Sequence, residues 1–132
     1  MITLHLGDCL EVLAGMPDQS VDAVICDPPY SDRTHDGHDG IEGVGGHRRA
    51  ISYDSMRLDM IGPYFGEIAR VCRGWICIFS DHVLVPHWEQ AARHSGRYAF
   101  APVVCMTPGG RVRLQGDGPS SWSDYLNVSR PR

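Results

Sequence analysis

The stretch VDAVICDPPYSD, residues Val21 to Asp32, joins an apolar run to an acidic residue, two prolines and a tyrosine. Five of its first six residues are apolar or small, which predicts a strand over Val21–Asp27. A near-continuous apolar run favours a parallel strand that is buried on both faces. The chain is therefore expected to leave the end of a buried strand directly through Asp27-Pro28-Pro29-Tyr30.

The residues before this strand predict the start of an α/β domain. Ile2–Gly7 alternates apolar and polar side chains, which predicts a first strand. Residues 9–16 carry apolar side chains at helical spacing and predict a short helix. The order strand, helix, strand implies two parallel strands joined by a right-handed crossover.

The later segments continue the same alternation. Apolar residues at steps of three and four predict an amphipathic helix after a cap at Asp54 or Ser55, with Pro63 as a kink or local break. Two further strands are predicted at Trp75–Ser80 and Tyr98–Met106, with a helix between them. The last twenty or so residues are polar and weakly patterned. The predicted fold class is α/β, with mostly parallel strands and flanking helices.

Composition limits the class of protein. A length of 132 residues, with 42% hydrophobic and 21% charged residues, predicts one globular domain with its own core. No apolar run approaches the roughly 20 residues of a membrane span, so no membrane partner is expected. Five scattered cysteines and no signal-peptide pattern predict buried thiols in a cytoplasmic protein. The net charge of -4 argues against nucleic-acid binding through bulk charge alone, although all twelve basic residues are arginines.

The segment Ser31–Ser52 is rich in Gly, His, Asp and Arg and has few apolar residues. It predicts a flexible loop inside the domain. His35, Asp36, His38 and Asp39 have the spacing of metal ligands, but a glycine-rich loop offers no preorganised geometry. No metal site is predicted there.

The residues after the Val21–Asp27 strand suggest a binding site. Ligands of open α/β sheets bind outside the carboxyl ends of the strands. The two prolines fix the backbone and leave the Pro28 carbonyl free as an acceptor beside the Asp27 carboxylate. Tyr30 adds a flat ring. Two acceptors next to a stacking surface suit a planar heterocycle that carries an exocyclic amine.

The run GDCLEVLAGMPDQSVDAVICDPPY resembles the amino-methylating DNA methyltransferases, which use S-adenosylmethionine to methylate adenine N6 or cytosine N4. The resemblance implies a Rossmann-like methyltransferase sheet and a double-stranded DNA partner with a flipped base. It makes Asp27, Pro28, Pro29 and Tyr30 the catalytic motif. Asp27 and the Pro28 carbonyl would accept hydrogen bonds from the target amine, and Tyr30 would stack on the base. Asp8 would line the pocket as a substrate-binding residue.

The same resemblance suggests further substrate contacts. An Asp as the first letter of the motif favours adenine, with cytosine as the alternative. Ser80 and Asp81 follow another strand and are candidates for lining the pocket, although strand-end capping explains them equally well. Arg111 follows a Pro-Gly-Gly turn, where the target-recognition segment of the family begins. Residues 107–132 are therefore interpreted as the start of that segment or a linker.

One part of the family pattern is missing. The permuted family order places a glycine-containing cofactor loop after the target-recognition segment, and no such loop follows a strand here. Residues 1–132 are therefore expected to form a partial catalytic domain, completed by a missing C-terminal half or by a second polypeptide. Cofactor-binding residues stay unassigned. The alternatives are a complete enzyme with a divergent cofactor site and an inactive remnant that binds DNA or a partner.

Overall fold

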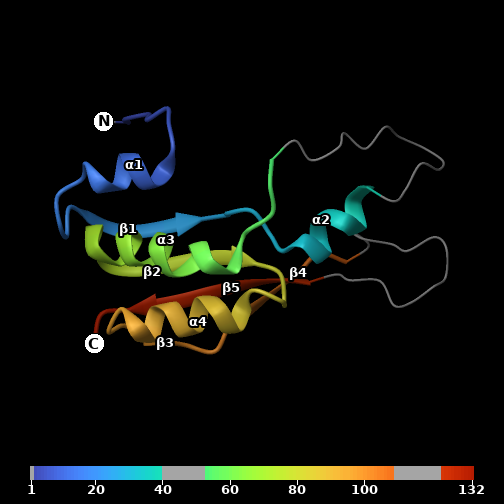
Figure 1. Cartoon of the computed structure of the whole chain (residues 1–132). Helices are drawn as coiled ribbons and strands as arrows, with labels where there is room; N and C mark the ends of the chain where they lie inside the picture. The colour runs from blue at the N-terminus through green and yellow to red at the C-terminus, as the bar shows by residue number, and fades with distance from the viewer. Residues whose placement is uncertain (1, 40–52, 109–122) are drawn as a thin grey trace.

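A computed structural model describes residues 2–39, 53–108 and 123–132 of the chain. The described residues form both helices and strands (Figure 1). In chain order the elements are α1 (Cys9–Ala14), β1 (Val21–Cys26), α2 (Asp32–Asp39), α3 (Leu58–Val71), β2 (Cys72–Ser80), α4 (Val85–His94), β3 (Tyr98–Ala99), β4 (Val103–Met106) and β5 (Ser123–Arg130).

The strands form one mixed sheet in the order β1-β2-β5-β3, and β4 also pairs with β5. β1 and β2 are parallel, with Ala23 opposite Trp75 and Cys26 opposite Ile78. β5 is antiparallel to β2, β3 and β4. Four strands therefore run in one direction and β5 runs against them. The α/β class is confirmed, although β1–β2 is the one hydrogen-bonded parallel pair among the described strands.

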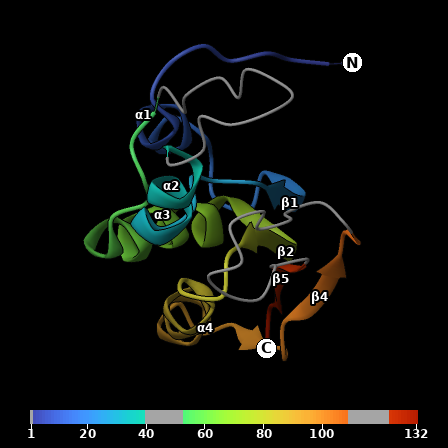
Figure 2. The same cartoon turned by 90° about the vertical axis from the view of Figure 1, so that its right-hand side faces the viewer.

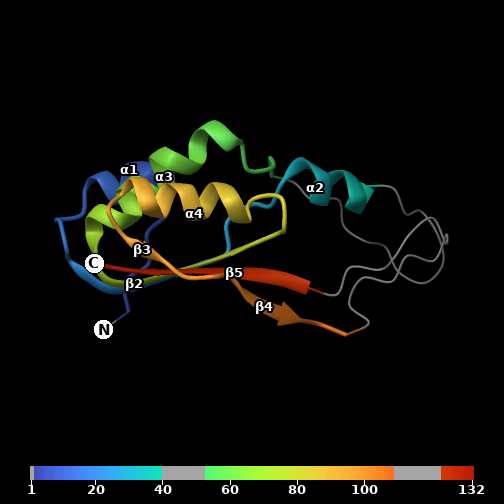
Figure 3. The same ribbon diagram turned by 90° about the horizontal axis from the view of Figure 1, so that it is seen from below.

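The core lies between the sheet and a single layer of helices, because α1, α3 and α4 all lie on one side of the sheet (Figure 3). Along β2 the side chains alternate, so that Ile76 and Ile78 are fully buried against the helices while Trp75 is 49% exposed on the other face. Phe65 of α3 and Trp88 of α4 complete this core. The opposite face of the sheet is covered by no helix within the described ranges.

The N-terminal segment differs from its prediction. Ile2–Gly7 was expected to form a strand, but these residues pair with no described strand. Ile2, Leu4 and Leu6 are 90%, 91% and 104% exposed. An alternating pattern makes a segment able to form a strand, but the strand exists only where its backbone pairs with a neighbouring strand.

Two other strand predictions need correction. β1 is parallel as expected but is not buried on both faces, because Ile25 is 75% exposed. The strand expected over Tyr98–Met106 is divided into β3 and β4. Pro102 lies in the interruption, and a proline has no N–H to donate to a sheet ladder.

The predicted loop over Ser31–Ser52 begins as a helix, since α2 occupies Asp32–Asp39. Its remaining residues, 40–52, lie outside the described ranges. Within residues 107–132, which were expected to begin the recognition segment or a linker, residues 123–130 form β5. This strand has β2 on one side and both β3 and β4 on the other. Its Asn127 side chain donates to the Ile78 carbonyl at 3.1 Å, so a polar residue is satisfied inside the sheet.

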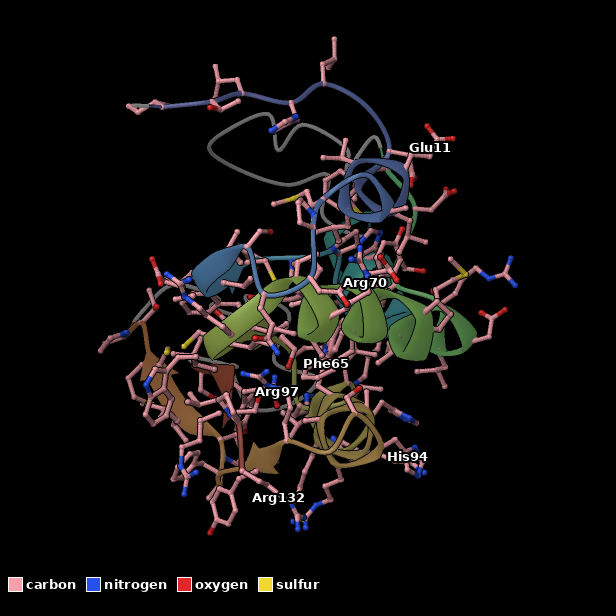
Figure 4. The ribbon with its side chains drawn as sticks, turned by 90° about the vertical axis from the view of Figure 1, so that its left-hand side faces the viewer. Glu11, Phe65, Arg70, His94, Arg97 and Arg132 are labelled. Carbon is pink, nitrogen blue, oxygen red and sulfur yellow. The ribbon has the colours of Figure 1, made fainter. Side chains whose placement is uncertain are left out.

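The helix α3 starts later than expected, at Leu58, and its N-cap Arg57 makes no side-chain capping bond. Pro63 lies inside α3, which continues through it. Arg70 near the end of α3 faces the segment after α1 (Figure 4) and donates to the carbonyls of Leu13 at 2.7 Å and Met16 at 2.9 Å. α1 is thereby tied to α3. None of the described helices is long and apolar enough to cross a membrane.

Candidate active site

A cavity of about 610 Å³ lies where α1, the end of β1 and the start of α3 meet. This volume lies within the range of small-molecule sites. Most of the lining is apolar, and a few polar groups lie among it. The lining residues include Cys9, Val12 and Leu13 of α1, Val24 and Cys26 of β1, Asp27, Pro28 and Pro29 after it, residues 54–57, and Met60, Tyr64 and Ile68 of α3.

Three of the four predicted catalytic residues line this cavity. Asp27, Pro28 and Pro29 follow β1 directly, at its carboxyl end. Asp27 is exposed, and no described residue donates a hydrogen bond to its carboxylate. Pro28 and Pro29 have no N–H, so they cannot cap the carboxylate locally. The carboxylate therefore remains available as an acceptor at the cavity wall.

Tyr30 is held through its backbone. Its carbonyl accepts a hydrogen bond from the Met56 N–H at 2.8 Å, and the next N–H, that of Ser31, donates to Asp81 at 3.0 Å. The Tyr30 side chain is half-buried and does not belong to the cavity lining. The segment after the two prolines is thus fixed on both sides of Tyr30.

The carboxylate of Asp81 is occupied by hydrogen bonds from within the protein. Its buried carboxylate accepts hydrogen bonds from the backbone and hydroxyl of Ser31, from the Thr34 hydroxyl at 2.6 Å, and from the N–H groups of Val83 and Leu84 at 3.1 Å each. Burial by itself would raise the pKa of Asp81, but the hydrogen bonds from Ser31 and Thr34 outweigh burial and lower the pKa below its ordinary value. Asp81 therefore connects the ends of β1 and β2 as an ionised cap.

The other predicted substrate contacts also lie away from the cavity lining or outside the described residues. Ser80 is fully buried, and its hydroxyl oxygen accepts a hydrogen bond from Asn127 at 2.8 Å. Asp8 is the N-cap of α1 and accepts from the N–H of Leu10 at 2.8 Å. Arg111 lies outside the described residues. The structure thus brings Asp27, Pro28 and Pro29 together at the cavity, and leaves Asp8, Ser80 and Asp81 out of its wall.

Sequence reasoning missed one wall of the cavity. Met60, Tyr64 and Ile68 belong to the apolar positions of the predicted amphipathic helix, and all three line the cavity. Their spacing of four residues puts them on one face of α3, and this spacing was the available signal. Burial raises the pKa of Tyr64, and the neighbouring Cys9 adds to the effect, so its phenol remains protonated at neutral pH.

The residue before Asp27 adds an uncharged group to the wall. Burial raises the pKa of Cys26 to about 11, with the Asp27 carboxylate as a second cause. The Cys26 thiol is therefore neutral near pH 7 and unsuited to act as a nucleophile. Asp27 is thus an acceptor beside a neutral thiol, which is an arrangement that recognises hydrogen-bond donors.

Comparisons with known proteins relate this chain to methyltransferases. No protein-family model matches the chain. The type II methyltransferase M.BamHI of Bacillus amyloliquefaciens is 31% identical over 87 residues, which is 65% of this chain and 18% of the relative. The chain thus spans less than a fifth of the length of this relative.

Solved structures show the same fold. TTHA0409 of Thermus thermophilus, a proposed DNA modification methylase solved in complex with S-adenosyl-L-methionine, superimposes with a TM-score of 0.63 at 19% identity over 96% of this chain and 52% of its own. The M1.HpyAVI–SAM complex superimposes with a TM-score of 0.63 at 15% identity, over 100% of this chain and 56% of its own.

These similarities define the class first: the chain has a partial α/β methyltransferase fold, which spans about half of the solved chains. The sequence similarity to M.BamHI points in the same direction as the fold, toward the DNA methyltransferases.

Proposed function

We propose that this chain is the catalytic half of a DNA methyltransferase that transfers a methyl group from S-adenosylmethionine to the exocyclic N6 amine of adenine. The observation that carries the proposal is the position of Asp27, Pro28 and Pro29 on the wall of a ligand-sized cavity, at the carboxyl end of a parallel strand. Ligands of α/β sheets bind at such strand ends. The similarity to M.BamHI supports the choice of reaction.

The chemistry follows from the types of group present. The lone pair of an aromatic amine is delocalised into the ring, so the amine is a weak nucleophile. Hydrogen bonds from its two N–H groups to the Asp27 carboxylate and the Pro28 carbonyl orient the amine and favour charge development on its nitrogen in the transition state. Asp27 suits this role because none of the described donors occupies its carboxylate.

The target base has to leave the DNA stack to reach these acceptors. Tyr30 is proposed to stack on the flipped base, as the resemblance implies. The hydrogen bonds on both sides of Tyr30, from Met56 and to Asp81, support this role because they fix the backbone from which its ring projects. A stacking side chain with a fixed backbone loses less entropy when the base binds.

S-adenosylmethionine supplies the methyl group, and the described residues fit only part of it. The cavity offers apolar walls and the polar groups of Asp27, Asp54 and Ser55. Neither β1 nor β2 is followed by a glycine turn, the feature with which such folds approach a cofactor closely. β1 leads into Asp27 and the two prolines, and β2 leads into Asp81 and His82. The principal cofactor contacts are therefore proposed to come from outside the described residues.

Adenine is preferred over cytosine because the motif begins with Asp, and cytosine N4 is the second candidate. The test is mass spectrometry of nucleosides from DNA incubated with labelled S-adenosylmethionine and the complete enzyme, meaning this chain with its other half. We expect label in N6-methyladenine and none with Asp27→Ala. Label confined to cytosine would reject the adenine assignment.

A binding role without catalysis is the competing function, because the chain spans only part of its relatives and offers a partial cofactor site. Calorimetric titration of the same complete protein with S-adenosylmethionine separates the two. Micromolar binding argues for the enzyme. A folded complete protein that binds DNA but neither binds the cofactor nor labels DNA is an inactive remnant.

A further inference from the structure

The cavity wall contains an arginine, Arg57, to which the proposed methyl transfer assigns no role. Apart from His5, the titratable side chains with a formal charge among the described lining residues are those of Asp27, Asp54 and Arg57. An arginine side chain does not lose its proton in proteins, so Arg57 is a permanent cation. A cavity that offers both a carboxylate and a fixed cation suits a ligand that carries hydrogen-bond donors and also an anionic group.

The backbone on both sides of Arg57 is fixed. Before it, the Met56 N–H donates to the Tyr30 carbonyl at 2.8 Å. The Arg57 carbonyl accepts a hydrogen bond from the Met60 N–H at 3.1 Å, at the start of α3. The position from which the Arg57 side chain extends is therefore set by the residue after the two prolines and by the first turn of a helix.

Two side-chain contacts hold the same segment against α2. The Ser55 hydroxyl donates to the Asp32 carboxylate, and the Tyr53 ring contacts the His35 ring edge-on at a centroid distance of 5.4 Å. Figure 2 shows this segment passing beside α2 as it enters α3. Arg57 is thus carried by a segment that is anchored to the residues directly after the catalytic motif.

This anchoring places Arg57 near the proposed base site. Asp27 precedes Tyr30 by three residues, which span at most about 11 Å of extended chain. Arg57 directly follows the residue that bonds to Tyr30, and its side chain is 73% exposed although it lines the cavity. Arg57 therefore lies at the mouth of the cavity. When a base enters a cavity, its phosphates stay at the mouth because the nucleic-acid strand continues outside.

The guanidinium of Arg57 has donors to offer. Its Nε and Nη2 donate to the Asp59 carboxylate at 3.0 Å and 2.6 Å, and its Nη1 has no hydrogen-bond partner within residues 2–39, 53–108 and 123–132. The side chains of this pair are 73% and 62% exposed. Ion pairs so exposed contribute little to stability, since water competes for both charges. Asp59 thus holds the guanidinium in place without excluding a phosphate, which arginine binds through two neighbouring N–H groups.

We propose that Arg57 binds a phosphodiester group of the DNA strand directly beside the flipped target nucleotide, at the mouth of the cavity. This role rests on the proposed function, because it takes the target base to be bound at Asp27. Asp59 competes with the phosphate for the same guanidinium. Arg57 therefore favours a base that belongs to a strand over a free nucleoside, which has no phosphate.

A DNA linkage without charge tests this contact by binding instead of methyl transfer. Duplexes with an unpaired target base carry one neutral methylphosphonate on the 5′ side of the target nucleotide, on its 3′ side, or well away from it. Fluorescence anisotropy gives their affinity for the complete enzyme. The parent should lose about threefold to tenfold at one of the two adjacent positions, the usual worth of one such hydrogen-bonded contact.

Arg57→Gln should lose a similar factor on the unmodified duplex and should then be insensitive to the neutral linkage. Such non-additivity is the mark of two groups in contact. The fall of log affinity with log salt concentration should also become shallower by about one in this variant, because one phosphate contact is lost. The Arg57 side chain is exposed, so the substitution should leave the protein folded.

The pair Arg93–Glu89 on α4 is the matched control. It is also an exposed ion pair at 2.6 Å, but neither residue lines the cavity. Arg93→Gln should leave DNA affinity unchanged. Asp59→Asn should raise the affinity, because it frees the guanidinium of Arg57, whereas Glu89→Gln should not.

The proposal would be overturned if Arg57→Gln showed no coupling to either adjacent phosphate, or if Arg93→Gln lost as much affinity. It would also be overturned if Arg57→Gln bound DNA normally but bound S-adenosylmethionine more weakly in calorimetry, because the anion would then be the cofactor's carboxylate. Coupling to one phosphate in a protein that transfers no methyl group would sustain the contact and reject the proposed function. Methyl transfer to adenine without coupling would do the opposite.

Discussion

Asp27 and Asp81 are both aspartates at the carboxyl end of a parallel strand, one after β1 and the other next to the end of β2, and yet their environments are opposite. Asp27 is exposed at the cavity and receives no hydrogen bond from the described residues. Asp81 is 4% exposed and accepts from two hydroxyls and three N–H groups.

The residues that follow each aspartate explain the difference. Asp81 is followed by His82, Val83 and Leu84 at the approach to α4, whose free N–H groups require an acceptor. Asp27 is followed by two prolines, which have no N–H to offer. A strand-end carboxylate is thus used for structure where donors follow it and remains available to a ligand where prolines follow it.

The largest effect is expected from removing the available carboxylate. Asp27→Ala should lower the rate of methyl transfer by the complete enzyme by about 10² to 10³, the usual cost of losing one positioned group of this kind. Its free energy of unfolding should change by less than about 0.5 kcal/mol, because the side chain is exposed and unpaired. Single-turnover kinetics measures the rate of methyl transfer, and urea denaturation measures the free energy of unfolding.

The control for this variant is Asp22→Ala. Asp22 is an exposed carboxylate on the same strand and pairs with Arg73 at the surface. The Asp22→Ala substitution should leave the rate of methyl transfer unchanged. Near-normal turnover in folded Asp27→Ala, or an equal loss of methyl transfer in Asp22→Ala, would contradict the functional role of Asp27.

Removing the buried carboxylate should act on stability first. Asp81→Ala leaves the hydroxyls of Ser31 and Thr34 and two N–H groups near α4 without their acceptor. The free energy of unfolding should fall by about 2–4 kcal/mol, as for other buried charged acceptors and caps. Chemical denaturation monitored by Trp fluorescence measures this loss. A loss no greater than in Asp27→Ala would show that the two aspartates are equivalent.

Variants of Tyr30 test whether the target base binds at the end of β1. Tyr30→Ala should weaken binding of DNA that carries an unpaired target base by about 1–3 kcal/mol, because a stacking surface is lost. Tyr30→Phe retains the ring and should bind within a few tenths of a kcal/mol of the parent. Fluorescence anisotropy with the complete enzyme compares them. Equal losses in both variants would mean that the hydroxyl, not the ring, is used.

The smallest effect is a pH dependence specific to Asp81. Because its pKa in the folded protein lies below the unfolded value, it stabilises the fold above about pH 4, and this contribution is lost as the pH falls through the folded pKa. The stability difference between the parent and Asp81→Asn should be constant near neutral pH and should narrow below about pH 4. Thermal unfolding over pH 7 to 3 measures it, and a difference that is independent of pH would contradict an ionised cap.

Local pattern was enough to predict several features of this protein. The α/β class, β1, β2 and α4, and the position of Asp27-Pro28-Pro29 at a strand end follow from periodicity and from the backbone chemistry of proline. These are properties of neighbouring residues, so no distant contact is needed to state them. The resemblance carried by the same stretch pointed to the family that sequence and fold comparisons support.

Tertiary structure decided the features that depend on distant partners. The weakly patterned residues 123–130 became a sheet strand because β2 and β4 supply ladders on both sides, whereas Ile2–Gly7, with a better strand pattern, pairs with no described strand. Ser80 and Asp81 proved structural because Asn127, Ser31 and Thr34 reach them from remote positions. A side chain's chemistry is set locally, but whether its polar atoms are occupied or open to a ligand depends on donors that only folding brings near.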